Sequence, residues 1–277
     1  MTKTRSKGKT NRKQTWLGLL AVVFCAAVLL ALLAGTPKSL PIPTTTVPET
    51  TAAAPTVPPN PYKPEDFQLD GDYLTYLPGG SRLGIDVSFY QGEIDWQQVA
   101  EAGVEFAMIR LGHRGYETGD LNTDELFFAN LSGARAAGLD VGVYFFSQAV
   151  SEEEAREEAE YVLSLLQDTA LEMPVVFDWE YVSSEARTGA VGRDTLTKCT
   201  NVFCRAVKEA GYTPMVYFNW HQGQEMLDLI ELTDYEFWLA MYDTAMDFPY
   251  KVRMWQYTES GHVPGIEGKV DLNLWLP

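Results

Sequence analysis

From Gly84 onward the sequence alternates short apolar runs with longer amphipathic segments. The apolar runs are "GIDVS" (84–88), "EFAMIRLG" (105–112), "DVGVYFFS" (140–147), "MPVVFDWE" (173–180) and "TPMVYFN" (213–219). Strands that are apolar on both faces and alternate with helices predict a parallel sheet covered by those helices. Five consecutive strand–helix units, whose strands all run in the same direction, restrict the fold to a barrel or a doubly wound sheet.

Three more strands are predicted in the last third of the chain, where the rhythm changes. They are "YEFWLAMYD" (235–243), "KVRMWQYT" (251–258) and "KVDLNLW" (269–275). The connections between them are about 7 and 10 residues long, whereas a parallel crossover needs a dozen or more, so we expect antiparallel pairing or degenerate connections. Eight strands and five helices in residues 83–277 predict an α/β fold, an irregular TIM-like (β/α)5(β)3 barrel smaller than the regular form of about 250 residues.

Two of the connecting helices have recognisable N-termini. Asp95 precedes Gln98 by three residues, and Ser151 precedes Glu154 by three, which is the spacing of a capping box. The helix after Ser151 has one apolar stripe, formed by Ala155, Ala159, Val162, Leu163 and Leu166. We therefore expect the acidic residues of this helix to lie on a solvated face.

An uncharged apolar segment, residues 16–34, follows a basic leader. It is long enough to cross a hydrocarbon layer about 30 Å thick as a helix. The leader, residues 1–15, contains six Lys and Arg residues and no acid, which favours a cytoplasmic N-terminus with the rest of the chain outside the cell. We expect a single-pass anchor in the cell membrane; cleavage near Ala34 as a signal peptide, followed by secretion, is the alternative.

Residues 35–82 are predicted to be a disordered linker. Nine of the 15 prolines lie between positions 36 and 64 among Thr and Ala, and no hydrophobic period is visible there. This composition is typical of a spacer that does not pack. Pro-rich chains extend by about 3.1 Å per residue, so the linker would hold the following domain away from the membrane.

The charge of the chain argues against nucleic acid as a partner. The net charge is −17, and all 38 acidic residues follow the basic leader. Such a surface repels phosphate backbones and anionic lipid, so we expect a neutral ligand or substrate. We also expect the protein to be a monomer. Cys199 and Cys204 point away from each other on one predicted helix, which favours buried thiols over a disulfide. An exported domain without disulfides is more typical of bacteria.

Polar residues gather at the predicted carboxyl ends of the strands, where barrel active sites lie. In "MPVVFDWEYV" Asp178 and Glu180 share one face of a strand, with Cβ atoms roughly 6.5 Å apart, and Trp179 faces the other way. Adjacent carboxylates at the end of a buried strand repel each other and lose hydration, so their presence needs a functional reason. The other strand ends supply Asp86, Asp271, Tyr144, Tyr217, Tyr242, Trp255 and Gln256.

Carboxylates ringed by aromatic side chains are typical of a carbohydrate site. Sugar rings stack their C–H faces on aromatic residues, and glycosidic cleavage needs a carboxylic acid that protonates the leaving oxygen. Each Asp alone could cap a helix or close a loop, but together they favour a glycosidase. Ser or Cys nucleophiles are not supported, because His113, His221 and His262 lie in loops without a G-x-S-x-G motif or a Cys partner. These histidines also lack metal-ligand spacing, so neither a metal nor another cofactor is expected.

Six ordered motifs resemble those of the family 25 glycoside hydrolases: "GIDVSFYQGEIDW", "GVEFAMIRLG", "GVYFFSQA", "PVVFDWE", "GYTPMVYFN" and "MWQYTESGHVPGIEGKVDLN". The resemblance covers about residues 83–277. It implies a barrel with five helices and three terminal strands, and a lysozyme that cuts peptidoglycan between N-acetylmuramic acid and N-acetylglucosamine. By position in the motifs it implies that Glu180 is the proton donor, Asp178 the second essential carboxylate, and Asp86 and Asp271 supporting acids.

The resemblance also implies substrate-lining roles for Tyr144, Tyr217 and Tyr242. One departure is visible: the loop in "RGYETGDLNTDELFFAN" is longer and more acidic than is usual in the family, which leaves the fit of distal sugars open.

The role of Asp178 in catalysis is open at this point. An ionised Asp178 beside a protonated Glu180 could attack the anomeric carbon, stabilise an oxocarbenium ion, or orient the N-acetyl group of the substrate as an internal nucleophile. We expect retention with participation of the acetamido group. Two non-catalytic functions are alternatives, a glycan-binding module and a wall-spanning tether; binding alone does not need an acid, which argues against the first.

Overall fold

The computed structural model describes residues 56–277. The predicted leader, the predicted membrane span at 16–34 and the first part of the predicted linker lie outside the described residues. Within residues 56–277, no helix has the length and apolar character needed to cross a membrane.

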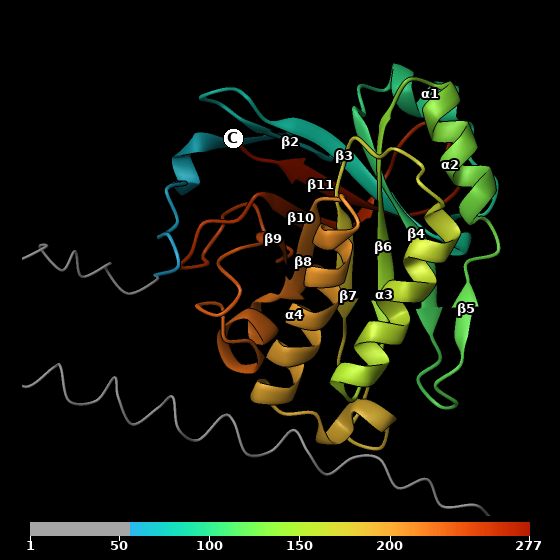
Figure 1. The fold of residues 1–277 in the computed structure, drawn as a ribbon. Coiled ribbons are helices and arrows are strands. Elements are labelled where there is room, and N and C mark those ends of the chain that lie inside the picture. Colours follow the sequence, from blue (N-terminus) through green and yellow to red (C-terminus); the bar gives the residue numbers. More distant parts are fainter. Residues whose placement is uncertain (1–55) are drawn as a thin grey trace, which may run out of the picture. The chain divides into compact units, whose positions relative to one another are not determined.

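Eight strands close into a barrel (Figure 1), with β3 paired to both β4 and β11. The strands are β3 (Arg82–Val87), β4 (Phe106–Arg114), β6 (Asp140–Ser147), β7 (Val175–Trp179), β8 (Pro214–Asn219), β9 (Glu236–Ala240), β10 (Met254–Gly261) and β11 (Val270–Trp275). Neighbours are parallel from β3 through β10, and β11 is antiparallel to both β10 and β3. The predicted barrel is confirmed. The short connection from β9 to β10 contains no helix, and that from β10 to β11 makes an antiparallel pair. Degenerate connections and antiparallel pairing, the two expected alternatives, therefore both occur.

Helices cover the outside of the barrel, and α3 and α4 lie side by side (Figure 1). They are α1 (Trp96–Glu101), α2 (Phe127–Ala136), α3 (Glu152–Leu166) and α4 (Arg193–Glu209). Both predicted N-caps are formed: Asp95 accepts from the backbone N–H of Gln98, and Ser151 from that of Glu154.

The expectation of five helices is wrong for the described residues, which contain four α-helices. The connection from β8 to β9 has only a π-helical turn, Gln222–Met226. Its first residue is held by two hydrogen bonds to Asn219, and its side chain turns inward to bond the carbonyl of Trp179. This tight turn takes the place of a longer helix.

The predicted linker, 35–82, is wrong from residue 57 onward. Strands β1 (Phe67–Asp70) and β2 (Tyr73–Tyr76) form an antiparallel hairpin that belongs to the same compact unit as the barrel. Val57 and Tyr62 are buried, and the Asn60 amide donates to the carbonyl of Phe248 at 2.8 Å. Val57 and Tyr62 are isolated apolar side chains among prolines, which is why they produce no regular hydrophobic pattern. A further short strand, β5 (Leu121–Thr123), pairs antiparallel with β4.

The barrel interior changes from apolar to polar along the strands. Its apolar part is a cluster of buried side chains from several strands, which includes Phe106, Met108, Val176, Met215, Trp238 and Met254. Gly84 makes room for one of these side chains, because a Cβ at this position would lie 2.2 Å from the Phe106 ring. Outward-facing strand residues such as Phe177 and Leu239 belong to a second core that also contains buried residues of the helices. Polar side chains gather at the carboxyl ends of the parallel strands, where the amino end of the antiparallel β11 also lies.

Candidate active site

A cavity of about 790 Å³ opens at the carboxyl ends of the strands, and we call it the cleft. Eight of the nine predicted site residues line it: Asp86, Tyr144, Asp178, Glu180, Tyr217, Tyr242, Gln256 and Asp271. The alternation of strand residues explains their convergence, since Asp178 and Glu180 line the cleft whereas Trp179 belongs to the outer core, as the sequence predicted.

Trp255 is the predicted site residue that the structure does not bring to the cleft. It follows Met254 and precedes Gln256, which both face the barrel interior, so its own side chain faces outward. The indole is fully buried, donates to the carbonyl of Met241 at 2.8 Å and packs edge-on against Phe67 of the hairpin. Its aromatic ring therefore stabilises the core and does not reach a ligand in the cleft.

Several residues of the cleft escaped the sequence analysis, among them Arg110, Trp238, Trp220 and Tyr90. Arg110 had a signal, because it is the one charged residue inside the apolar run "FAMIRLG" and shares a strand face with Met108. Trp238 could also have been found from strand alternation, because it lies two residues before Ala240 and both side chains face the barrel interior. Trp220 and Tyr90 lie after strands, where periodicity gives no information.

Asp86 and Asp271 face each other across the antiparallel pair of β3 and β11. The amide of Gln256 donates to Asp86 at 2.9 Å and to Asp271 at 3.2 Å, and the amide of Asn273 donates to Asp86 at 2.7 Å. Burial raises the pKa of Asp271 to about 9, and the neighbouring Asp86 adds to this effect. Asp271 is therefore protonated at neutral pH, which allows two carboxyl groups to share one buried site.

The same amides position two tyrosines. Gln256 accepts hydrogen bonds from the hydroxyls of Tyr217 at 3.0 Å and Tyr242 at 3.2 Å. Asn273 accepts from the indole of Trp238 at 2.8 Å. One network thus joins the acids of β3 and β11 to aromatic residues at the cleft wall and fixes the orientation of each ring.

Asp178 and Glu180 form a coupled pair of carboxyl groups. Burial raises the pKa of both, and the charge of Glu180 raises that of Asp178 further. One oxygen of Asp178 is buried without a hydrogen-bond partner in the described part of the chain. The nearest compensating charge is that of Arg110, which lowers the pKa of Asp178 but is bound to Asp124 at 2.8 Å. The pair therefore retains a proton at a pH where exposed carboxyls have lost theirs.

The sequence expectation places this proton on Glu180, and this assignment stays a prediction, because the two carboxyl groups titrate as a coupled pair. Asp178 is buried, whereas Glu180 is partly exposed in the cleft.

Two buried amides hold the backbone on either side of Glu180. The Gln222 side chain donates to the carbonyl of Trp179 at 2.7 Å, and the Gln148 side chain donates to the carbonyl of Glu180 at 2.7 Å. Gln148 in turn accepts from the Thr188 hydroxyl at 3.3 Å, and its own carbonyl accepts from Arg187 at 2.6 Å. The segment that carries the acid is therefore fixed from both neighbouring loops.

Between residues 56 and 277 no three His, Cys, Asp or Glu side chains are grouped so that they could hold a metal ion. Cys199 and Cys204 are buried free thiols, as predicted.

The chain is similar to several known proteins. It is 28% identical over 203 residues to the uncharacterized protein YegX of Escherichia coli K12, covering 69% of this chain and 68% of that protein. It is 28% identical over 203 residues to Lysozyme M1 of Streptomyces globisporus, covering 69% of this chain and 66% of that protein.

A solved structure with a similar fold is that of the modular autolysin LytC from Streptococcus pneumoniae in complex with a synthetic peptidoglycan ligand. The TM-score is 0.65 at 26% identity, and the match covers 78% of this chain and 49% of that one, so the chain spans about half of the autolysin. Residues 85–266, which contain most of the barrel and three of the four predicted site acids, match the glycosyl hydrolases family 25, and the chain therefore belongs to that family.

Proposed function

We propose that the protein is a peptidoglycan hydrolase, an N-acetylmuramidase that cleaves the β-1,4 bond between N-acetylmuramic acid and N-acetylglucosamine. The observation that carries this proposal is the pair Asp178 and Glu180, which shares one face of the cleft with raised pKa values. A site that only binds sugar has no use for such a pair, because it destabilises the fold. The similarity to a lysozyme and to an autolysin supports the choice of substrate.

Glu180 is the general acid in this mechanism. When sugar fills the cleft and excludes water, the proton of the pair moves to the glycosidic oxygen through Glu180, and Asp178 becomes the carboxylate that faces the anomeric centre. Asp178 then orients the acetamido group of the substrate, which attacks the anomeric carbon, and the configuration is retained after hydrolysis. Tyr217 and Tyr242 line the sugar site, and Asp86 and Asp271 hold it in shape through Gln256.

The products of digestion test this function. Purified peptidoglycan is incubated with the full-length protein in detergent, and the released fragments are analysed by mass spectrometry after borohydride reduction. The expected fragments have reduced N-acetylmuramic acid at their ends, and NMR at early times shows the retained anomer first. Fragments ending in reduced N-acetylglucosamine would refute the bond assignment. Binding without release of fragments would support the alternative, a glycan-binding or wall-tethering protein.

We also propose where the enzyme works. Residues 16–34 anchor it in the cell membrane as a single-pass helix, the N-terminus is cytoplasmic, and the catalytic domain acts outside the cell as a monomer. The uncharged run and the basic leader support this proposal. The enzyme then acts on wall within reach of its linker, either in remodelling or in lysis.

Fractionation tests the anchor. Full-length protein should stay in the membrane pellet after alkaline carbonate washing, whereas a variant lacking residues 1–55 should be soluble, monomeric in sedimentation and equally active on isolated peptidoglycan. This boundary keeps Val57 and Tyr62, which are buried in the folded unit. A shortened form in the medium would identify residues 16–34 as a cleaved signal.

A further inference from the structure

A second cavity, of about 800 Å³, adjoins the cleft, and we call it the side cavity. The two cavities share Tyr90, Arg110 and Phe146. The remaining wall of the side cavity is built largely by the loop 115–125, together with Phe89 and His113. This loop is the one that the sequence analysis singled out as long and acidic.

Arg110 is the central polar group between the two cavities. Its side chain is 11% exposed; the Nε donates to Asp124, and the guanidinium lies 5.0 Å from the ring centre of Phe89 and 5.3 Å from that of Tyr90. Its Nη2 is buried and has no hydrogen-bond partner. Asp124 already takes bonds from two backbone N–H groups, so it cannot satisfy every donor of the arginine.

Unpartnered polar atoms are concentrated around these cavities. The described residues contain five buried side-chain atoms without a partner, and three of them belong to Arg110, His113 and Asp178. Each such atom costs about 1–3 kcal/mol unless a ligand satisfies it. Asp178 is explained by catalysis in the adjoining cleft. The unpartnered guanidinium N–H of Arg110 therefore points to a ligand of the side cavity that offers a hydrogen-bond acceptor.

The wall of the side cavity is held in place before any ligand binds. The loop is closed by backbone bonds from Gly115 to Asp120 and from Gly119 to Gly115, each 2.9 Å long. Arg114 donates to the carbonyl of Gly119 at 2.8 Å and so fixes the loop to the barrel. Gly119 has φ +79° and lies against the Arg187 side chain, so a larger residue would disturb both. A preformed wall keeps the ordering cost of binding low.

The chemistry of the walls favours a peptide over a sugar. If the substrate is peptidoglycan, as proposed above, its glycan strand is neutral where the lactyl group is amidated, whereas the stem peptide carries free carboxylates. An unsatisfied guanidinium matches a carboxylate and gains little from a neutral sugar. Glu117 and Glu125, which also line the side cavity, match the amino group of a diamino acid residue. Exposed rings such as Tyr116 offer apolar contact for small side chains.

We propose that the side cavity binds the stem peptide attached to a muramic acid residue in the cleft, with Arg110 binding a carboxylate of the peptide. This proposal rests on the proposed function. It makes the enzyme selective for strands that still bear stems, and it gives the long loop a role in substrate choice.

Two substrates that differ in the stem test the proposal; removal of the stem also frees the lactyl carboxylate of each muramic acid, so both are assayed at high ionic strength, which screens this charge. One is uncross-linked peptidoglycan strands with intact stems, and the other is the same strands after an amidase has removed the stems. We compare kcat/KM of the full-length protein with Tyr116→Ala, with Arg110→Lys, which keeps a positive charge beside Asp124, and with Phe128→Ala as a control for an exposed aromatic side chain on α2. Phe128 is 59% exposed and lines neither cavity.

The wild-type protein should cleave stem-bearing strands faster than bare ones. Tyr116→Ala should slow cleavage of stem-bearing strands by about 10-fold and leave bare strands within about two-fold, since a lost aromatic contact of this kind is worth roughly 1.4 kcal/mol. Arg110 borders the cleft, so Arg110→Lys can slow cleavage of both substrates. It is therefore judged by the ratio of kcat/KM on stem-bearing strands to kcat/KM on bare strands, which should approach one. Phe128→Ala should change neither.

Three results would overturn the proposal. If Tyr116→Ala slows both substrates equally, the side cavity binds sugar; if it slows neither, the cavity has no part in recognition. A wild-type enzyme that prefers bare strands would also refute it. Failure of the proposed function is distinct, because the wild-type protein would then cleave neither substrate.

Discussion

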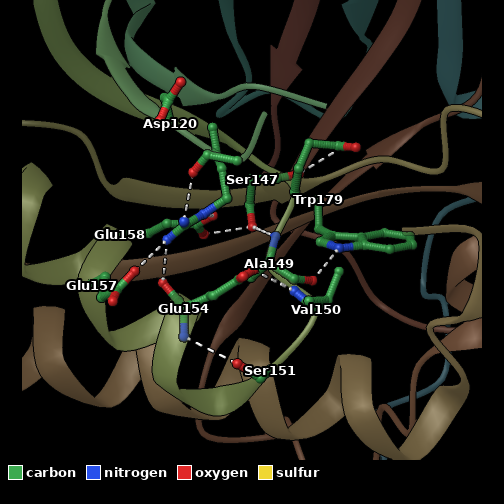
Figure 2. Close-up of polar contacts among 12 residues, drawn as sticks. Asp120, Ser147, Ala149, Val150, Ser151, Glu154, Glu157, Glu158 and Trp179 are labelled. Carbon is green, nitrogen blue, oxygen red and sulfur yellow. Dashed lines mark hydrogen bonds and ion pairs between the residues drawn. The ribbon is translucent and has the colours of Figure 1, made fainter. Parts of the chain in front are cut away.

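Two groups of carboxylates, each with buried members, lie in this domain, and they differ in how their charge is compensated. The cleft group is Asp86, Asp178, Glu180 and Asp271. The second group, which we call the Arg114 cluster, consists of Arg114, Ser147, Glu154, Glu157 and Glu158. Figure 2 shows three acids of the cluster near Ser147, with Glu158 bonded to the Ser147 hydroxyl and the Trp179 indole bonded to Ala149 nearby.

The Arg114 cluster is fully paired. Arg114 donates to Glu158 at 2.7 Å, to Glu157 at 3.1 Å and to the carbonyl of Glu154 at 2.9 Å. The Ser147 hydroxyl donates to the other oxygen of Glu158 at 2.6 Å. In the cleft, by contrast, the acids are held mainly by amides, and one oxygen of Asp178 has no partner.

The pKa values of Arg114 and Glu158 are both raised, which favours the charged form of Arg114 but the neutral form of Glu158. The carboxylates raise the pKa of Arg114 against the effect of burial, whereas burial raises the pKa of Glu158 to about 7 although Ser147 and Arg114 lower it. Since Arg114 keeps its charge and lies at bonding distance, we take Glu158 to be ionised at neutral pH. The comparison teaches that burial alone does not make a carboxyl reactive. Burial without a bonded cation leaves a proton that can be given away.

The largest expected effect comes from breaking the paired group. Arg114→Met leaves Glu158 buried without its cation, and the free energy of unfolding should fall by about 3–5 kcal/mol. Urea denaturation measures this change. Lys198→Met is the control, because it breaks the exposed bridge to Asp194 and should leave the unfolding free energy nearly unchanged. An Arg114→Met protein whose free energy of unfolding is nearly unchanged would mean that the cluster does not need its cation.

The next effect concerns chemistry and not stability. Glu180→Gln keeps the shape of the side chain and removes its proton, so kcat on peptidoglycan should fall by at least about 10²-fold while the unfolding midpoint and glycan binding persist. Glu160→Gln changes an exposed acid on α3 in the same way and should be fully active. Activity of Glu180→Gln within a few-fold of the wild type would show that another group is the acid.

A smaller effect is expected from the amide that positions the acid. Gln148→Met removes the bond to the carbonyl of Glu180 without exposing the site, and kcat should fall by about 10-fold with little change in KM, because a misplaced acid weakens mainly the transition state. The upper limb of the pH profile should shift as well, which a purely structural loss would not cause. Gln97→Met, at an exposed position on α1, is the control.

Much of this fold could be predicted because strand residues alternate. The phase of "PVVFDWE" places Asp178 inside and Trp179 outside, and the same rule brings Tyr144 and Tyr217 to the cleft. Trp255 shows where the prediction failed, since an aromatic residue near a strand end was assigned to the site although Gln256 beside it already faced inward. Applying the alternation of inward and outward side chains to every strand would have excluded Trp255 from the predicted site.

Other errors arise from contacts between distant segments. Glu158 was expected to face solvent because it is acidic, yet it is fully buried by its pairing with Arg114, 44 residues earlier. Tyr62 was assigned to a disordered linker, but its hydroxyl bonds the carbonyl of Pro277, 215 residues away. No local pattern contains these partners, so neither burial could be read from one segment of sequence.

The most direct test of the comparison is Asp178→Asn, with stability and turnover measured on the same protein across pH. The folded-state pKa of Asp178 is raised, so the wild type is least stable where this group is ionised and gains stability as falling pH protonates it before the unfolded chain. At neutral pH the variant should therefore unfold with a free energy about 1 kcal/mol higher than the wild type, and this gain should vanish in acid. Its turnover should collapse. A variant that is less stable at neutral pH and still cleaves peptidoglycan would contradict the account, because Asp178 would then be a structural residue like Glu158.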